Sequence, residues 1–306
     1  MTIKEIAKQA GVGVSTVSRY LNDGYVSEEK REIIKRVIED NNYQRNQAAV
    51  TMRGKSQEIV VIVQRVSSNT TSRFLEGVIK QCELLDYKPT IHVVNFNLKL
   101  QEQYIKAAVD RNVQGIIVYS FTEQINVDYK NLLVVGQHSQ KYKSIYSNGK
   151  KVYSELVDNI IKNNDVYDVE VLGIDILDVE FVNRVAGAID AAKANGIAYK
   201  VWEESFDKVH TSFKLRKGTY YVALTDSQAY QIIQLANEQN LVVGKDVFIS
   251  GYGDYGTSSL LELTTVDGRY EEVGSLAVDT IVNSNSDSTE IKPIINYRKT
   301  TGHKKK

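Results

Sequence analysis

Short apolar stripes at helical spacing fill the first forty residues of the chain. The stripes consist of Ile3, Ile6, Ala7 and Ala10, then Val17, Tyr20 and Leu21, then Ile33, Ile34, Val37 and Ile38. Gly11 ends the first helix by supplying left-handed geometry, and Ser27 caps the third, with acidic residues in its first turn. The pattern predicts three helices that bury their stripes against one another.

The exposed face of the second predicted helix carries the first candidate chemistry. Its residues are Val14, Ser15, Thr16, Ser18 and Arg19. Short side chains let the backbone approach the DNA major groove closely, and an Arg can form a bidentate contact to a guanine edge. Two helices joined by a glycine-containing turn therefore predict a DNA-binding helix-turn-helix. An ordinary helical hairpin is the alternative.

From residue 58 the pattern changes to strands alternating with helices. Strands are predicted at 59–63, 90–95, 115–119, 132–136, 169–174, 198–202, 220–224 and 246–250, and helices at 73–85, 99–110, 152–161, 179–194 and 227–238. Because this alternation restarts after Gly149, it predicts an α/β body of two lobes, each a doubly wound parallel sheet. Ligands of such sheets bind at the carboxyl ends of strands, which here face a cleft between the lobes.

Charge and composition agree with a local DNA contact. The 306 residues suit two or three domains, with 42% hydrophobic and 25% charged residues. Residues 1–57 hold ten Lys or Arg against seven Asp or Glu, and the remainder holds 28 against 31. A basic head on an acidic body fits DNA binding by the head. One cysteine, no signal-like start and no long apolar run predict a cytoplasmic protein without a membrane span.

Enzyme and cofactor patterns find little support. The four histidines are scattered without metal-ligand spacing, and Cys82 lies among apolar residues of a predicted helix, as a core residue does. Gly251, Gly253 and Gly256 follow a strand with the spacing of a dinucleotide fingerprint, but no long helix is predicted after them. We therefore expect no catalytic residues, no metal and no cofactor.

The amino-terminal run resembles the lactose-repressor/galactose-repressor family of bacterial transcription regulators. The matching words are Thr2-Ile-Lys-Glu-Ile-Ala, Ala10-Gly-Val, Ser15-Thr-Val-Ser-Arg-Tyr-Leu-Asn22, Val26-Ser27, Asn42-Tyr43 and Asn46-Gln-Ala-Ala. The resemblance extends more weakly over the rest of the chain, whose body it identifies as a periplasmic-binding-protein-like core. It implies a headpiece at 1–45, a hinge helix and linker at 46–57, and an effector-binding and dimerisation core at 58–306.

The resemblance also implies that the hinge helix folds in the DNA minor groove. Its expected DNA contacts are Asn46, Ala49, Met52 and Arg53. The sequence departs from the family pattern at Arg45 in place of a Pro, Val50 in place of an Arg and Met52 in place of a Leu wedge. Met is still an acceptable apolar wedge, and the lost Pro predicts a less ordered hinge. An ordinary linker is the alternative.

Effector chemistry is implied at three places in the body. Arg184 opens the family's Arg-x-x-Gly word, whose Arg clamps sugar hydroxyls, and Thr225 with Asp226 matches a polar word at the cleft. Gly253 stands where an Asp usually accepts from a sugar hydroxyl, which puts a simple monosaccharide in doubt. For Arg184, a surface ion pair is the alternative.

Arg65 follows the first strand of the body and lies among small polar residues, including Ser67 and Ser68. An Arg beside hydroxyls at a strand end suits a phosphate or carboxylate, although a solvated Arg is as compatible with the pattern. Arg65-Val-Ser and Phe121-Thr are weakly similar to trehalose-type repressors, which sense a phosphorylated disaccharide.

These features together predict a sequence-specific DNA-binding regulator. We expect a repressor of a sugar-utilisation operon that is released by a sugar or sugar phosphate. We expect it to bind a pseudo-palindromic operator as a homodimer, because a two-fold symmetric site needs two headpieces. The alternative hypothesis is a stand-alone sugar-binding module or a sugar-processing enzyme. A regulator whose ligand promotes DNA binding, a corepressed regulator, is also compatible with the main prediction.

Overall fold

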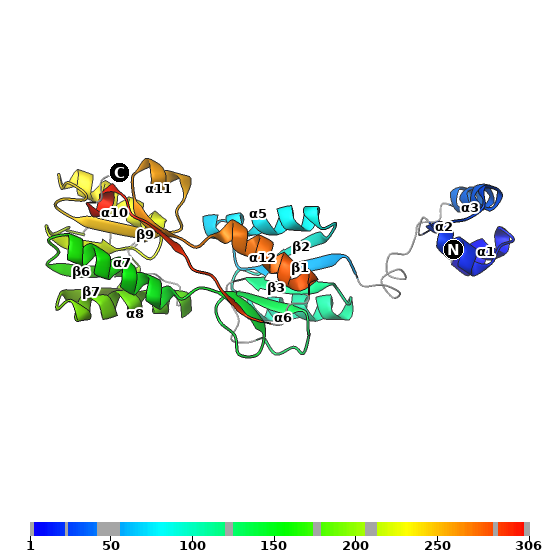
Figure 1. Ribbon diagram of the computed structural model, residues 1–306, viewed down its shortest axis with the longest axis horizontal. Helices are drawn as coiled ribbons and strands as arrows, with labels where there is room; N and C mark the ends of the chain where they lie inside the picture. The colour runs from blue at the N-terminus through cyan, green and yellow to red at the C-terminus, as the bar shows by residue number, and fades with distance from the viewer. Residues whose placement is uncertain are drawn as a thin grey trace. The chain divides into compact units, whose positions relative to one another are not determined.

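A computed structural model describes residues 3–21, 24–41, 56–119, 125–173, 179–205, 213–283 and 287–302. The chain divides into two compact units, 1–54 and 55–306, which we call the headpiece and the body (Figure 1).

The headpiece contains three helices, α1 (Ile3–Gln9), α2 (Val14–Leu21) and α3 (Glu28–Asp40). Its core is formed by Ile6, Ala7, Ala10, Val17, Val26 and Ile34. The described residues of the first two predicted stripes therefore pack in this core, with Tyr20 partly buried, whereas the side chains of Ile3 and Leu21 lie outside the described part. In the third stripe Ile34 is buried as predicted, but Ile33 is 39% exposed, and Val37 and Ile38 are only partly buried. Gly11 at the end of α1 has φ +63°, the left-handed geometry that its position predicts.

The first lobe of the body is built on a six-stranded sheet. Its strands are β1 (Glu58–Val63), β2 (Lys88–Val93), β3 (Gly115–Tyr119), β4 (Leu132–Gly136), β5 (Lys143–Tyr146) and β11 (Thr289–Glu290), in the order β11-β5-β4-β3-β1-β2 and with every pair parallel. The helices are α5 (Asn69–Leu84), α6 (Leu98–Asp110) and α12 (Tyr270–Val282). Figure 1 shows α12 beside α5, although nearly two hundred residues separate them.

The second lobe repeats this arrangement. Its strands are β6 (Asp168–Gly173), β7 (Ala198–Ser205), β8 (Thr219–Val222), β9 (Phe248–Tyr252), β10 (Thr264–Asp267) and β12 (Ile294–Asn296), in the order β12-β10-β9-β8-β6-β7. Only the edge pair β10–β12 is antiparallel among the pairs described. The helices are α7 (Gly149–Asn163), α8 (Val179–Ala194), α10 (Asp226–Glu238) and the short α11 (Gly256–Leu260), and a 3-10 turn follows at Lys299–Thr301.

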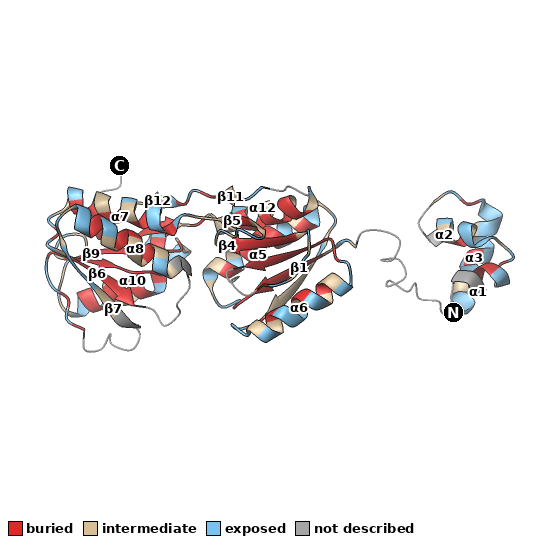
Figure 2. Cartoon of the chain, turned by 90° about the horizontal axis from the view of Figure 1, so that it is seen from below, coloured by how far each residue is buried: buried red, intermediate tan, exposed pale blue. Residues whose placement is uncertain are grey.

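Apolar residues fill the layers between sheets and helices, so the central strands are buried in both lobes (Figure 2). The chain passes between the lobes after β5, after β10 and after β11. The predicted pair of doubly wound lobes is confirmed. The sequence pattern missed β5 and every element after β9, and α5 begins four residues before the predicted helix. Cys82 is buried in α5, and burial raises the pKa of its thiol to about 11, as expected for a core residue.

Candidate functional site

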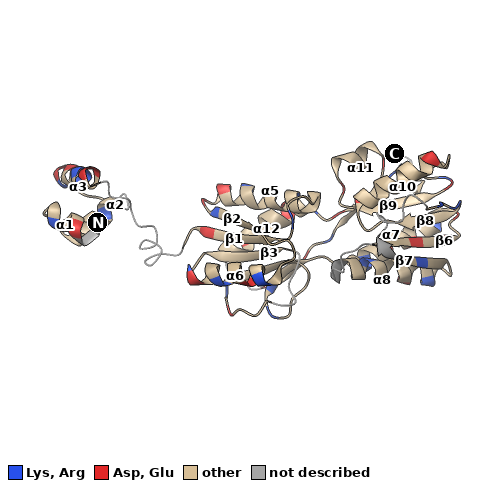
Figure 3. Ribbon diagram, turned by 180° about the vertical axis from the view of Figure 1, so that it is seen from behind, with Lys and Arg blue, Asp and Glu red and all other residues tan. Residues whose placement is uncertain are grey.

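The exposed face of α2 presents the residues predicted to contact DNA. Val14, Ser15 and Arg19 are exposed, and Thr16 and Ser18 are half-buried. Val17 on the opposite face is fully buried, which fixes the rotation of the helix. The helix has no acidic residue in its first turn, whereas α3 carries acids and bases along its length (Figure 3). The face of α2 therefore combines small side chains with one basic group, as major-groove recognition requires.

The predicted hinge contacts Asn46, Ala49, Met52 and Arg53 lie outside the described residues. Phe121, which contributed to the trehalose-type resemblance, does so as well. The assignment of these positions stays a prediction.

A cavity of about 280 Å³ lies between the two lobes of the body. It is lined by residues at the carboxyl ends of strands in both sheets, including β1, β3, β5 and β9. Its aromatic lining consists of Phe96, Tyr119, Tyr146, Phe181, Tyr252, Tyr255 and Tyr270. Among the lining residues that the structure describes, Arg65 and Arg184 are the charged ones, and each belongs to a different lobe. The cavity thus offers ring faces and two cations to a small ligand.

Arg184 is held rigidly in the wall of the second lobe. Its side chain comes from α8 and is 92% buried, since the residue is 8% exposed. Its Nη1 donates to the carbonyl of Leu224, 3.2 Å away, and its guanidinium carbon lies 3.5 Å from the ring centre of Tyr252. Phe181 approaches the same guanidinium at 5.0 Å. Arg184 is therefore a buried and preoriented residue of the cavity wall, not a surface residue.

Gly187, the glycine of the Arg-x-x-Gly motif, allows α8 to pack closely against α7 near Arg184. It lies three residues after Arg184 on α8, where a Cβ would come 2.1 Å from the carbonyl oxygen of Lys150 in α7. Only a glycine permits this approach of the two helix backbones. Because α7 and α8 pack so closely there, the glycine fixes the position from which Arg184 reaches the cavity.

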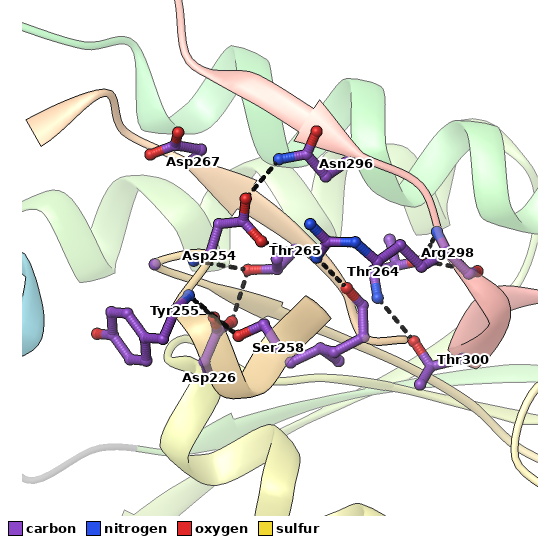
Figure 4. A network of polar contacts seen from close by, with 12 residues as sticks. Asp226, Asp254, Tyr255, Ser258, Thr264, Thr265, Asp267, Asn296, Arg298 and Thr300 are labelled. Carbon is purple, nitrogen blue, oxygen red and sulfur yellow. Dashed lines mark hydrogen bonds and ion pairs between the residues drawn. The ribbon is translucent and has the colours of Figure 1, made fainter. Parts of the chain in front are cut away.

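Thr225 and Asp226 begin α10, but they face different surroundings. Thr225 lines the cavity and caps the helix, because its side chain accepts from the backbone N–H of Gln228. Asp226 is fully buried and accepts hydrogen bonds from the hydroxyls of Ser258 and Thr265, as Figure 4 shows. The structure therefore corrects one expectation: Asp226 fixes the cavity wall from behind and is not placed to accept from a ligand.

Burial raises the pKa of Asp226, and the hydrogen bonds from Ser258 and Thr265 act against that shift. The backbone N–H of Tyr255 also donates to this carboxylate, at 3.3 Å. These partners lie about thirty to forty residues along the chain from Asp226. Asp226 thus ties the start of α10 to the loop after β9 and to β10.

The loop after β9 replaces an acidic side chain by an aromatic ring. Gly253 has φ +134°, and a Cβ there would lie 2.5 Å from the ring of Tyr255. The ring of Tyr255 lines the cavity, and desolvation raises the pKa of its hydroxyl to about 12, so that it is neutral near pH 7. Asp254 turns away to pair with Arg298 at 2.7 Å (Figure 4). Because residue 253 is a glycine, this position places no acidic side chain in the cavity wall.

Arg65 lies at the rim of the cavity in the first lobe. It is exposed, and its guanidinium carbon lies 4.6 Å from the ring centre of Phe96. Ser68 also lines the cavity and shares a hydrogen bond with Thr70, with oxygens 2.7 Å apart. Ser67 is exposed and is not among the lining residues. Of the three first-lobe residues predicted to bind effector, the structure brings Arg65 and Ser68 to the cavity.

The sequence reading missed most of the aromatic lining. Tyr252 was recognisable as the aromatic of the Gly-aromatic word, but Tyr119, Tyr255 and Tyr270 come from a strand end, a loop and the start of an unpredicted helix. The strand-end position of Tyr119 was the one signal available for it.

Among the residues that the structure describes, no cluster of three or more His, Cys, Asp or Glu could hold a metal ion. Within the same residues, no helix has the length and apolar character needed to cross a membrane.

Comparison with known proteins agrees with both units. Residues 2–46 match the family described as bacterial regulatory proteins, lacI family. The sucrose operon repressor of Staphylococcus xylosus is 28% identical over 91% of this chain and 92% of its own length, and the regulator TreR of Salmonella typhimurium is 26% identical over 92% and 93%. A crystal structure of the lac repressor dimer bound to operator and an anti-inducer superimposes with a TM-score of 0.78, at 20% identity, over 98% of this chain and 99% of that one.

A helix-turn-helix headpiece joined to a two-lobed body with an internal cavity defines a ligand-responsive DNA-binding regulator. The headpiece belongs to the lacI family of bacterial regulatory proteins, and relatives that align over nine-tenths of the chain are named as an operon repressor and a transcriptional regulator. The chain is therefore a DNA-binding transcriptional regulator.

Proposed function

We propose that this regulator represses a sugar-utilisation operon and is released from its operator by a sugar or sugar phosphate. The observation that carries the proposal is the cavity with one arginine from each lobe, Arg65 and Arg184. A ligand that contacts both lobes has a different affinity for open and closed arrangements, and only such a ligand can shift their populations. The names of the relatives support a sugar, since they include sucrose and ribose operon repressors.

The lining of the cavity favours a sugar over a purely apolar ligand. Aromatic residues such as Tyr146 and Tyr255 line the cavity, and rings of this kind can pack against the C–H groups of a sugar. Thr225 and Gln64 offer side-chain groups that can exchange hydrogen bonds with hydroxyls. Arg184 is already oriented by Leu224, so it can bind hydroxyls with little further loss of side-chain freedom.

The first lobe favours a phosphate on that sugar. Arg65 lies at the rim, and Ser68, Thr70 and Thr71 line the cavity at the start of α5. The first N–H groups of a sixteen-residue helix lack intrahelical partners, and its dipole attracts an anion. No acidic residue lies in the first turn of α5 to oppose the anion.

We further propose that the active unit is a cytoplasmic homodimer that binds a pseudo-palindromic operator. Ligand closure of the lobes would move the two first lobes relative to each other and prevent the hinge segments from folding together on DNA. Arg73 supports coupling between the lobes of one chain. From α5 it donates to the carbonyl of Gly253 at 3.0 Å and pairs with Asp267 at 3.2 Å.

The test combines a thermal-shift screen of mono- and disaccharides and their 6-phosphates with gel shifts on an imperfect palindrome. A ligand at a hundred times its dissociation constant stabilises by ~2.7 kcal/mol, which is readily measured. We expect the stabilising compound to release the operator. Tighter operator binding with ligand would instead identify a corepressed regulator. Absence of any specific DNA complex would favour a stand-alone sugar-binding protein.

Two substitutions divide the roles of the arginines. Arg65→Ala should weaken a phosphorylated ligand roughly ten- to a hundredfold, as expected for loss of a charge-assisted bond, and barely affect its unphosphorylated parent. Arg184→Ala should weaken both. Operator binding without ligand should survive each change, because neither residue lies in the headpiece. If Arg65→Ala binds every compound as the parent does, the ligand is neutral and the phosphate proposal is wrong.

A further inference from the structure

The backbone beside Arg65 holds an aromatic residue in a conformation that such residues seldom adopt. Between β2 and α6, Asn95 has φ +48° and Phe96 has φ +62°. Asn tolerates left-handed backbone, but for a bulky side chain such as Phe it is a genuine outlier. A strained residue persists only where its surroundings hold it, and such residues concentrate at ligand sites.

A buried glutamine holds this turn in place. The backbone N–H of Phe96 donates to the side-chain oxygen of Gln64 at 2.9 Å, and the N–H of Asn95 donates to the Gln64 carbonyl at 2.9 Å. The amide of Gln64 in turn donates to Gln101 on α6 at 3.3 Å. Gln64 is 5% exposed and Gln101 is 3% exposed, so water competes little for these bonds.

The ring that results stands at the cavity, beside the guanidinium of Arg65. Phe96 and Arg65 both line the cavity, and the guanidinium carbon is 4.6 Å from the ring centre. The ring remains 37% exposed, so the strained conformation does not serve to bury it in the core. A cation held over a ring face has fewer orientations available to it than a solvated one.

We propose that Phe96 is a positioning residue of the effector site. Its ring, fixed by Gln64 in left-handed backbone, holds the Arg65 guanidinium toward the cavity and so sets the affinity for the anionic group of the ligand. This inference rests on the proposed function in two respects, namely that the cavity binds a small ligand and that the ligand carries an anionic group. It adds that an aromatic residue outside the family words controls the charge preference of the cavity.

The first test replaces the ring but keeps the backbone. Phe96→Asn introduces a residue that tolerates positive φ, so the melting temperature should stay unchanged or rise by up to about 3 °C. Affinity for inorganic phosphate and for the 6-phosphates of sucrose and trehalose should fall roughly two- to thirtyfold, the range of a cation–π contact. Affinity for unphosphorylated sucrose and trehalose should change much less. Asn95→Gly is the matched control, because it also relieves positive φ but leaves the ring in place, and it should not change anion affinity.

A double-mutant cycle asks whether Phe96 acts through Arg65. In the Arg65→Ala background, Phe96→Asn should produce no further loss of phosphate affinity, since the guanidinium that it positions is gone. Additive losses would mean that the ring contacts the ligand by itself and would overturn the positioning role. A fall in melting temperature that accompanies an equal affinity loss for charged and neutral sugars would make Phe96 a packing residue and would also overturn it.

The operator assay keeps this inference separate from the proposed function. If a neutral disaccharide releases the operator and none of the phosphate compounds stabilises the parent protein, the sugar-responsive repressor stands and the inference fails. If phosphate binds in a Phe96-dependent manner but no ligand changes operator binding, the inference stands and the proposed function fails.

Discussion

Gly187→Ala is the substitution whose effect on stability the structure predicts most directly. A Cβ at this position would lie 2.1 Å from the carbonyl oxygen of Lys150 and 3.0 Å from the backbone nitrogen of Ser154. Both atoms belong to the backbone of α7, so no side-chain rotation can relieve the contact. The two helices must move apart, by about 1 Å to reach an ordinary carbon–oxygen separation.

Two opposing effects set the magnitude. Overpacking a well-packed core typically costs about 1–3 kcal/mol, whereas Ala in a helix interior gains about 0.5–1 kcal/mol over Gly. The overpacking effect is the larger because the clash is with backbone, so we expect a net loss of roughly 0.5–2 kcal/mol. Movement of α8 also displaces Arg184, so ligand affinity should fall as well, while operator binding without ligand should persist.

The single tryptophan offers a local reporter. Trp202 lies on β7 of the second lobe, and its ring centroid is 4.8 Å from that of Phe213. Urea unfolding followed by its fluorescence should give a lower midpoint for Gly187→Ala with little change in slope. Gly256→Ala is the control, because a Cβ at Gly256 meets nothing within 4 Å. If the two alanine variants unfold at the same urea concentration, the close-approach explanation of the Arg-x-x-Gly spacing is refuted.

Three further predictions concern the headpiece, the hinge and the cavity wall. Arg19→Ala should weaken operator binding by about 1–3 kcal/mol and relax preference at one base pair, as measured with a panel of operator variants; equal weakening on every sequence would indicate a phosphate contact. Met52→Ala should reduce DNA bending and operator affinity in a bending gel-shift assay but leave ligand affinity unchanged; unaltered bending would return this segment to a simple linker. Because the folded pKa of Asp226 is raised above its ordinary value of 3.8, its contribution to stability is present below that pH and is lost as pH rises through the folded pKa. Asp226→Asn should therefore gain urea resistance relative to the parent as pH rises from about 4 to 7, and parallel pH curves for the two proteins would contradict this.

Most of the fold could be predicted because its central strands are continuous apolar runs. Parallel strands covered on both faces need such runs, and those before residue 253 stand out from the amphipathic helices between them. The exceptions have physical reasons. β5 (Lys143–Tyr146) is short and mixes polar with apolar residues, so no run marks it. In α12, Gly274 and the β-branched end of the helix lower its helix propensity, and packing against α5 overrides this.

The cavity residues could be predicted only where their position at the carboxyl end of a strand is enough to place the side chain at the cavity. Arg65 follows a strand, and Thr225 lies between a strand and a helix, so both were expected at the carboxyl edge of a sheet. Asp226 follows the same rule but faces the opposite way, because Ser258 and Thr265 compete for its carboxylate. Those partners lie far along the chain, and no local pattern reveals them.

The two arginines of the cavity differ in how much order they have before a ligand arrives, and this difference bears on how closure is driven. Arg184 is buried and held by Leu224 and Tyr252, so its orientation is fixed when the second lobe folds. Arg65 is exposed and stands over Phe96 at the rim. A ligand can therefore dock first on the preformed second lobe, where its affinity changes little between open and closed arrangements. In the proposed mechanism, the bonds that form only on closure are those to Arg65 and the start of α5. Because only such state-dependent bonds shift a population, the first lobe should supply most of the free energy that couples ligand binding to operator release.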